Sequence, residues 1–393
     1  MNLYPTIGDL TCVKSLGKLT AGDIILYKQN KTDKFYAVKM IDKSITRQSN
    51  LFKYLVSELQ LLKKLNHPNI AKLIKLIDNE TQTHLLLVME YCNDGTLSEC
   101  LEKFKKFKGK PFTEEIVQYL TKQIVEALIY IHDNNIIHRD LKLENIMVHF
   151  DNNNDKENLN MMKAKIKIID FSLSKQLESK NALTSSLLGT PLYMSPNILK
   201  QYGANKNLKN LRYGTEVDIW SLGCICYELL TGNNVFKAHS LDGLINNIKE
   251  GNYRIPNNVS LEFMYFLNSM LQYDGKKRST AKELLKSEFL TKNVKDFKYY
   301  NGNDKIIFNI YRLNENIEIY NLNISNSFNP NLPNNDNIVY PNYGQFMFEN
   351  SLTQNSHQKN KRSYISQYSN YNNYYGSGNS SHNEIQFNNQ ITK

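Results

Sequence analysis

Two short segments in the middle of the chain restrict its fold and chemistry more than any other part of the sequence. The first, Ile136 to Val148, reads IIHRDLKLENIMV, and the second, Lys165 to Ser172, reads KIKIIDFS. Phosphoryl transfer needs a carboxylate beside the attacking hydroxyl, a cation on the γ-phosphate, and a further carboxylate with an amide to hold Mg²⁺. These groups are supplied by Asp140, Lys142, Asp170 and Asn145.

The two segments resemble the HRDLxxxN catalytic loop and the DFG-type metal motif of eukaryotic protein kinases. The resemblance implies an α+β fold with two lobes, a small strand-rich lobe over residues 10–90 and a larger helical lobe over residues 91–290, after a short lead of residues 1–9. It also implies ATP and Mg²⁺ as cofactors. Asp140 is then expected to position the substrate hydroxyl and accept its proton, and Lys142 to neutralise the γ-phosphate. The expected Mg²⁺ ligands are Asn145 and Asp170.

A lysine and a glutamate upstream of these segments fit the same family pattern. Lys39 lies in AVKM, an alternating run rich in strand-forming residues, and Glu58 lies in SELQLLKKL, which has apolar residues at helical spacing. The resemblance implies that Lys39 contacts the α- and β-phosphates of ATP and that Glu58 orients it through an ion pair. Taken alone, two such residues are also compatible with an ordinary exposed pair.

The loop expected to cover the phosphates departs from the family pattern. Gly17 and Gly22 match two of its glycines, but Leu19 stands in place of the middle one. A side chain there hinders the approach of backbone amides to phosphate, so we expect weaker ATP binding or loop closure. The same alignment implies an adenine pocket, with Met89 at its rear, formed by Ile24, Ala37, Glu90, Cys92 and Met147. The apolar members of this set are equally compatible with plain core positions.

Two further departures from the family pattern lie at Ser172 and Asn197, and the first is expected to affect regulation more than chemistry. Ser172 replaces the glycine of DFG and narrows the backbone conformations available for switching between states. Asn197 replaces a glutamate that pairs with a buried arginine, here Arg278, and we expect the amide to accept a weaker hydrogen bond from it. Asp218, in VDIWSLG, is expected to hold the backbone of the catalytic loop, a role compatible with capping the helix that begins there.

Residues around the catalytic loop also indicate a substrate class. Lys142 and Thr190 resemble the serine/threonine kinases rather than the tyrosine kinases, and Leu173 resembles the residue type associated with preference for serine. Protein substrates are therefore expected. Glu144 and Glu228 match positions that favour a basic residue near the phosphoacceptor in some relatives, although glutamate at such positions is also common as a plain solvated residue.

An arginine before the catalytic aspartate suggests regulation by phosphorylation. Such an arginine, here Arg139, is typically neutralised by a phosphate on the activation segment. The candidate acceptors in that segment are Thr184, Ser185 and Ser186. The competing hypothesis is a pseudokinase scaffold that binds partners with little or no phosphotransfer, because Leu19, Ser172 and Asn197 each weaken part of the machinery. The intact groups for phosphate and metal argue against it.

Composition fits one large catalytic unit with an appendage. A chain of 393 residues with 41% apolar residues can bury such a core. Its five cysteines show no metal-ligand spacing, and Cys224 and Cys226, in the apolar stretch WSLGCICYELL, are expected to be free buried thiols. No signal peptide opens the chain and no apolar run reaches bilayer length, so we expect a reduced, cytoplasmic protein. The net charge of +10 invites a nucleic-acid hypothesis. Because the lysines are scattered, solvated faces without nucleic-acid binding are expected, and binding to acidic proteins or, peripherally, to anionic lipids is the alternative.

Two regions lie outside the shared catalytic pattern. The polar stretch DNNNDKENLNMMK, Asp151 to Lys163, is too hydrophilic for a core and is predicted to form a hairpin tip. Beyond residue 290 the chain is rich in Asn, Tyr and Ser, so residues 291–393 are predicted to be largely disordered. The apolar rhythm of Ile306 to Ile324 fits docking on the catalytic unit or on a regulatory protein, or a tail without function. EYCNDGTL, the insertion and GTPLYMSP together resemble the autophagy-initiating ULK-type kinases.

Overall fold

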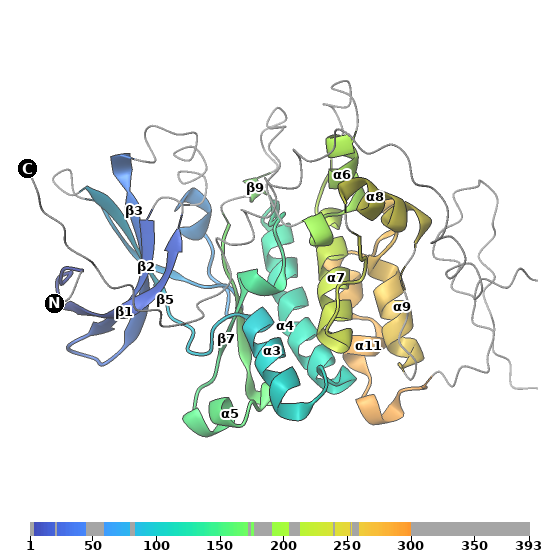
Figure 1. Cartoon of the computed structure of the whole chain (residues 1–393), viewed down its shortest axis with the longest axis horizontal. Coiled ribbons are helices and arrows are strands. Elements are labelled where there is room, and N and C mark those ends of the chain that lie inside the picture. Colours follow the sequence, from blue (N-terminus) through green and yellow to red (C-terminus); the bar gives the residue numbers. More distant parts are fainter. Residues whose placement is uncertain are drawn as a thin grey trace, which may run out of the picture. The chain divides into compact units, whose positions relative to one another are not determined.

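A computed structural model of the chain (Figure 1) describes residues 4–19, 22–44, 59–78, 83–171, 174–176, 191–203, 213–238, 240–251, 253 and 259–299. All of them belong to one compact unit, Met1–Leu313. Some expectations concern residues outside the described ranges and stay predictions. These residues are Glu58, Ser172, Leu173, Thr184, Ser185, Ser186, Thr190 and 300–393.

The N-terminal part of this unit is a five-stranded sheet in the order β1-β2-β3-β5-β4. All neighbouring strands are antiparallel. The strands are β1 Leu10–Leu19, β2 Gly22–Gln29, β3 Phe35–Asp42, β4 Leu73–Ile77 and β5 His84–Glu90. This sheet is the small strand-rich lobe that the sequence predicts, drawn in blue in Figure 1.

The two faces of the sheet bury different side chains, because successive residues of a strand point to opposite faces. One face carries a small apolar cluster that includes Ile25, Tyr27 and Val88. On the other face, Leu87 belongs to the large core shared with the helical lobe. Lys39 lies directly opposite Leu87 in the pairing of β3 and β5. Lys39 therefore lies on the face that turns toward the helical lobe.

The larger lobe is mainly helical. Its helices are α3 Leu97–Lys108, α4 Glu114–Asp133, α6 Pro196–Gly203, α7 Glu216–Thr231, α8 Leu241–Glu250, α9 Leu261–Met270, α10 Ala281–Leu285 and α11 Glu288–Thr291. In α4, apolar residues at helical spacing such as Val117, Ile124 and Leu128 have no exposed surface. Trp220 of α7 is likewise fully buried. These two helices place the core of the lobe directly behind the catalytic loop.

The start and end of α3 follow rules readable from the sequence. Thr96 caps the helix by accepting a hydrogen bond from the amide of Glu99, and the Glu99 carboxylate accepts one from the amide of Thr96. Gly109 ends the helix in the left-handed conformation, with φ of 70°. Because β5 ends at Glu90, only a few residues separate this capped helix from the sheet.

Short strands form the region between the helices. β6 Ile136–Ile137 pairs with β9 Lys175–Gln176, and β7 Ile146–His149 pairs with β8 Lys165–Ile168. The polar insertion lies between β7 and β8 and contains α5 Asn153–Glu157 and a 3₁₀ turn, Met161–Lys163. The predicted hairpin tip is confirmed. The prediction that it is too hydrophilic for the core is wrong for Met161, which is 1% exposed.

Apolar packing of the helical lobe extends a few residues past residue 290, the predicted end of the catalytic unit. Residue 290 falls inside α11. Phe297 is buried, with its ring centre 5.7 Å from that of Phe289, and Tyr299 forms a β-bridge with Ser260. The helical lobe therefore continues to Tyr299, because apolar packing extends past the point where the composition changes.

The prediction of free buried thiols at Cys224 and Cys226 is confirmed, and Cys92 and Cys100 are free and buried too. Burial raises the pKa of Cys92 and of Cys226 to about 12, so both thiols are neutral at physiological pH. No helix in the described part of the chain has both the length and the apolar content of a membrane span.

Candidate active site

The catalytic loop joins β6 to the 3₁₀ turn Leu143–Asn145 and brings three chemically different side chains together. Lys142 Nζ lies 3.1 Å from Asp140 Oδ2. Asn145 Nδ2 donates to the same oxygen at 2.9 Å and to the carbonyl oxygen of Asp140 at 2.7 Å. A carboxylate, a cation and an amide thus meet at one point, as the spacing predicts. Their roles in transfer remain predictions.

Asp170 follows β8 and is held beside Asn145. The amide of Ile169 donates to the carbonyl oxygen of Asn145 at 2.9 Å, and His138 Nε2 lies 3.0 Å from the carbonyl oxygen of Ile169. Asp170 has a positive φ of 63°, which is uncommon for a residue with a side chain. The next residue, Phe171, has no exposed surface and packs edge-on against the ring of His138 at 4.9 Å. Buried neighbours therefore hold the unusual conformation.

A buried carboxylate beneath the loop holds its backbone. Asp218, in the first turn of α7, has no exposed surface and accepts hydrogen bonds from the amides of His138 at 2.9 Å and Arg139 at 2.8 Å. His132 Nε2 lies 2.9 Å from Oδ2, the carboxylate oxygen that also accepts from His138. Burial alone would raise the pKa of Asp218, but the hydrogen bond and charge of His132 and the amide of Arg139 lower it below the ordinary value. The prediction that Asp218 holds the loop is confirmed.

Sequence reasoning missed His132, although a signal for it exists. This residue lies in the last turn of α4, shortly before the catalytic loop. A histidine at the end of an apolar helix can reach groups that follow it in the chain. The capping alternative for Asp218 is wrong, because α7 is preceded by Thr215 as its capping residue and Asp218 lies inside the first turn.

Arg139 adopts a left-handed backbone conformation, with φ of 71°. Its guanidinium lies 5.4 Å from the ring centre of Tyr213. The expected partners of this guanidinium on the activation segment fall outside the described residues. Neutralisation by a phosphate therefore stays a prediction.

The glycines of the phosphate-covering loop differ in what they are needed for. Gly17 lies opposite Ile24, and Leu19 lies opposite Gly22, in the pairing of β1 and β2. A Cβ atom at Gly22 would lie 1.8 Å from the carbonyl oxygen of Met40, whereas one at Gly17 would meet nothing within 4 Å. Gly22 is therefore required by the close approach of β2 to β3, a reason that the sequence motif does not reveal.

Residues expected around the adenine share one face of the sheet. Ile24 lies opposite Lys39, and Ala37 lies opposite Met89. Because Ala37 and Lys39 are two positions apart on β3, their side chains point the same way, toward the helical lobe. Met147 lies on β7 in the other lobe and forms a β-bridge with Thr96. The strand register thus brings the sheet residues together as expected.

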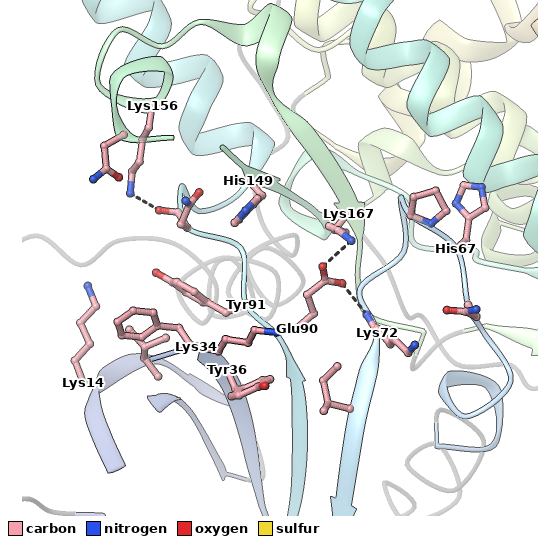
Figure 2. Close-up of a pocket in the computed structure, with 17 residues that line it drawn as sticks. Lys14, Lys34, Tyr36, His67, Lys72, Glu90, Tyr91, His149, Lys156 and Lys167 are labelled. Atoms are coloured by element: carbon pink, nitrogen blue, oxygen red, sulfur yellow. Dashed lines mark hydrogen bonds and ion pairs between the residues drawn. The ribbon is translucent and has the colours of Figure 1, made fainter. Parts of the chain in front are cut away.

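The segment Glu90–Cys92, which we call the hinge, connects β5 to the helical lobe. The Glu90 carboxylate lies 2.7 Å from Lys167 Nζ and accepts a hydrogen bond from the amide of Lys72 at 3.3 Å (Figure 2). Because Glu90 follows Met89, its side chain points to the opposite face of the sheet from the expected adenine residues. The role expected for Glu90 in nucleotide binding is therefore restricted to its backbone.

Arg278 is buried in the helical lobe, near the start of α7. Its guanidinium donates to the carbonyl oxygens of Gln272 and Glu216, both at 2.8 Å, and lies 4.9 Å from the ring centre of Trp220. It also donates to Asn197 Oδ1 at 3.0 Å. The expected hydrogen bond between Asn197 and Arg278 is confirmed.

Known proteins resemble the chain over the region that contains this site. Residues 10–290 match the family model described as protein kinase domain. The chain is 34% identical over 286 residues to serine/threonine-protein kinase 33 of Bos taurus, which covers 71% of this chain and 54% of that protein. It is 31% identical over 280 residues to a probable serine/threonine-protein kinase of Dictyostelium discoideum, covering 71% and 51%. It is 32% identical over 289 residues to the RAC-beta serine/threonine-protein kinase of Homo sapiens, covering 72% and 54%. The match thus spans about half the length of these relatives.

Proposed function

Because this chain belongs to the protein kinase family, we propose that it transfers the γ-phosphate of ATP to hydroxyls of protein substrates, to serine more readily than to threonine. The observation that carries the proposal is the meeting of Lys142 and Asn145 at one carboxylate oxygen of Asp140. The names of the three relatives described above, each a serine/threonine kinase, support the choice of hydroxyl class.

In this mechanism each side chain has one task. Asp140 holds the substrate hydroxyl in line with the γ-phosphate and accepts its proton, because a carboxylate is the only base among the three groups that meet there. Lys142 neutralises negative charge on the oxygens of the γ-phosphoryl group while that group is transferred. The donation from Asn145 to Asp140 orients the carboxylate and leaves the amide oxygen of Asn145 for another ligand.

The residues beside this centre fit a magnesium ion. Mg²⁺ prefers oxygen ligands and is commonly held by one or two protein groups together with phosphates. The carboxylate of Asp170 and the amide oxygen of Asn145 are such ligands, and the hydrogen bond between Ile169 and Asn145 keeps their segments adjacent. When bound, Mg²⁺ offsets negative charge on the phosphates.

A pair of acidic side chains supports selection of a basic residue near the phosphoacceptor. The Glu228 carboxylate accepts hydrogen bonds from the hydroxyl of Tyr193 and from Asn234 Nδ2, the latter at 3.2 Å. Burial raises the pKa of Glu228, and the nearby charge of Glu144 raises it further. A cation between the two carboxylates relieves this repulsion. We therefore propose an arginine or lysine close to the modified serine in good substrates.

The test is transfer of labelled phosphate by the purified chain with ATP and Mg²⁺. The peptides form a matched set with serine, threonine or tyrosine as the acceptor, each with and without a neighbouring arginine. We expect the serine peptide with arginine to react fastest. Asp140→Asn is expected to lower the rate by about 10²-fold or more while leaving ATP binding intact.

Asp133→Asn is the matched control, because Asp133 is an exposed carboxylate on α4 that pairs with Lys282. Its rate is expected to stay at the wild-type value. Equal rates for Asp140→Asn and the wild type would contradict the mechanism.

The second candidate function is a pseudokinase scaffold, favoured by Leu19 and Asn197, which depart from the family pattern. Thermal unfolding with ATP separates the two. A competent site is stabilised by ATP slightly without Mg²⁺ and clearly more with it, because the metal adds contacts only in the folded state. No response to nucleotide under either condition supports the scaffold.

Regulation by phosphate on Thr184, Ser185 or Ser186, paired with Arg139, is also part of the proposal. It rests on the position of Arg139 directly before the catalytic aspartate. A role in autophagy, a cytoplasmic location and a regulatory protein bound through residues 291–393 stay predictions.

A further inference from the structure

A groove of about 770 Å³ lies behind the hinge (Figure 2). Its walls come from both lobes. They are formed by Lys14, Phe35, Tyr36 and Ile74 of the sheet, by Lys34 and Lys72 directly before β3 and β4, by Glu90 and Tyr91 of the hinge, and by Lys156 and Lys167 of the helical lobe. The expected adenine residues Ile24, Ala37 and Met147 do not line it. Of the nucleotide residues, only Glu90 lines it, through the side chain that points away from the adenine face.

The charge of this groove is strongly positive. Five lysines line it, and Glu90 is the one acid among the described residues of its wall. Lys167 is neutralised by Glu90, and Lys156 donates to the carbonyl oxygen of Asn93. The other three lysines are exposed and form no ion pair with any residue that the structure describes, namely Lys14, Lys34 and Lys72. These three ammonium groups are available to an anionic partner.

The histidines of the groove do not add to this charge. Burial lowers the pKa of His67 and of His149 below the ordinary value, so both are neutral at pH 7. The amide of Asn69 donates to His67 Nδ1 at 3.1 Å, which agrees with a neutral ring. The lysines alone therefore set the sign of the groove.

Large apolar side chains lie exposed between the charges. Phe35 is 44% exposed and Ile74 is 48% exposed, although both are on strands of the folded sheet. The ring centre of Phe35 lies 6.2 Å from that of Tyr91 in the hinge. Exposed apolar side chains within a charged concave surface are typical of a binding site. The occupant therefore has apolar side chains as well as negative charge.

The spacing of the lysines distinguishes an extended occupant from a compact one. In Figure 2, Lys14 and Lys72 lie on opposite sides of the groove, with Lys34 between them. A single phosphate group binds where several donors converge on one point. Charges spread along a groove instead suit a chain that carries several carboxylates. We propose that this groove binds an acidic segment of another protein, in which aromatic or aliphatic residues alternate with glutamate or aspartate.

The insertion between β7 and β8 builds one wall of the groove and fixes it. Asn93 Nδ2 donates to the carbonyl oxygen of Phe150 at 2.8 Å, and the amide of Phe150 donates to Asn93 Oδ1 at 2.9 Å. Lys156, on α5, adds a second link to the same residue by donating a hydrogen bond to the carbonyl oxygen of Asn93. The wall is thus held in place before any partner binds, which reduces the entropy lost on binding.

The test is fluorescence anisotropy of a fluorescein-labelled peptide, EEFEEFEE, with the full chain at about 0.1 M salt, where surface charges are only partly screened. We expect binding that weakens as salt is added. The variant Lys14→Glu/Lys34→Glu/Lys72→Glu is expected to bind about tenfold more weakly or worse. No nucleotide is present, and Asp140→Asn is expected to bind the peptide like the wild type. The outcome is therefore separate from the question of phosphotransfer.

The matched control is Lys276→Glu/Lys277→Glu/Lys286→Glu, which makes the same change in net charge at exposed lysines of the helical lobe. We expect its affinity for the peptide to stay within about twofold of the wild type, because separated surface charges are screened by salt. Thermal unfolding of both triple variants checks that each is folded. Equal losses of binding in the two variants mean attraction to net charge alone and overturn the proposal.

A second variant tests the apolar part of the proposal. Phe35→Ala removes apolar contact area and keeps every charge. It is therefore expected to weaken the binding of EEFEEFEE by about fivefold and to leave the binding of EEGEEGEE unchanged. Identical effects on the two peptides contradict the apolar contact. A single-stranded oligothymidylate that binds more tightly than the peptide, through the same three lysines, means a nucleic-acid site and overturns the proposal as well.

Discussion

Two buried charges support the active site at the same end of α7, and they are stabilised in different ways. The carboxylate of Asp218 accepts hydrogen bonds from two backbone amides and is in hydrogen-bond contact with the ring of His132. The guanidinium of Arg278 donates to backbone carbonyl oxygens and to the neutral amide of Asn197. An ion held by several well-placed hydrogen bonds keeps its charge even without solvent, whereas a charged donor gains less from a neutral acceptor than from a carboxylate. The catalytic loop therefore depends on the stronger of the two arrangements.

The largest effect is expected from breaking the stronger arrangement. Asp218→Asn keeps the shape but removes the charge and turns an amide nitrogen toward backbone donors. We expect the free energy of unfolding to fall by about 3 kcal/mol. The rate of phosphotransfer is expected to fall by about 10²-fold, because the loop that carries Asp140 loses its position. Urea unfolding and peptide phosphorylation measure the two quantities.

Asp242→Asn provides the control for this substitution. Asp242 is also an acid in the first turn of a helix, α8, but it is exposed. A loss of stability as small at Asp218 as at Asp242 would mean that the buried charge does not hold the loop.

Lowering the pH removes the negative charge of Asp218 without a substitution and so gives a second test of the stronger arrangement. Because the pKa of Asp218 is lowered in the folded chain, the unfolded chain takes up the proton first as the pH falls. The stability that Asp218 contributes is fully present above about pH 5, begins to be lost as the pH falls through the ordinary carboxyl pKa of about 4, and continues to be lost down to the lower pKa of the folded chain. The wild type is therefore expected to lose more stability between pH 5 and pH 3 than Asp218→Asn.

Urea midpoints of the two proteins over this pH range measure the difference. Glu114 and Glu228 have pKa values that burial raises, so they act in the opposite direction. Both proteins contain them, and their contribution cancels in the comparison. Parallel pH curves for the two proteins would contradict the prediction.

The smallest effect is expected from strengthening the weaker arrangement. Asn197→Asp adds a charge at an oxygen that already lies 3.0 Å from Arg278 Nη2. A charge-assisted hydrogen bond is worth about 1 kcal/mol more than a neutral one, which corresponds to roughly 2 °C in Tm. Asn197→Leu has a similar size and no acceptor, so it is expected to shift Tm in the other direction. A fall in Tm for Asn197→Asp would mean that Arg278 is already neutralised by other groups.

The catalytic centre was largely predictable from the sequence, because its parts lie close together in the chain. Asp140, Lys142 and Asn145 fall within one short loop, so their meeting follows from local geometry. Asp218 is distant, but its motif on an apolar helix marks it. The strand register that groups Ala37 and Lys39 follows from alternation alone.

The groove behind the hinge was not predictable in the same way. Lys14, Lys34, Lys72 and Lys156 come from four separate segments that only tertiary packing brings together. In the sequence they look like scattered solvated lysines. The packing of Phe297 against Phe289 was not predictable for a related reason, since it lies beyond the change in composition that marks the tail.

The pair of hydrogen bonds between Asn93 and Phe150 limits where the chain can bend when one lobe rotates relative to the other. The residues after Asn93 are bonded to β7 as well, because the amide of Asp94 donates to the carbonyl oxygen of Val148 at 3.1 Å. The chain from Asn93 onward therefore belongs mechanically to the helical lobe. At the other crossing, the amide of Ala71 donates to the carbonyl oxygen of Ile168 at 3.0 Å. The segment before Ala71 is bonded to the helical lobe as well, since the amide of Asn66 donates to the hydroxyl of Tyr130 at 3.0 Å. Where β4 and β5 join the helical lobe, the pivots are thus the bonds just after Ala71 and those around Tyr91.

An axis through these two pivots passes beside the hinge end of the sheet. In the strand register, Glu90 lies opposite Tyr36 at one end of β3, whereas Gly22 lies opposite Ile41 near the other end. Displacement in a rotation grows with distance from the axis, so the tip formed by Leu19 and Gly22 travels far while the hinge end hardly moves. We expect the space between the lobes to widen most at the end where the phosphates of ATP are expected. A departing nucleotide would then lose its phosphate contacts before its base contacts.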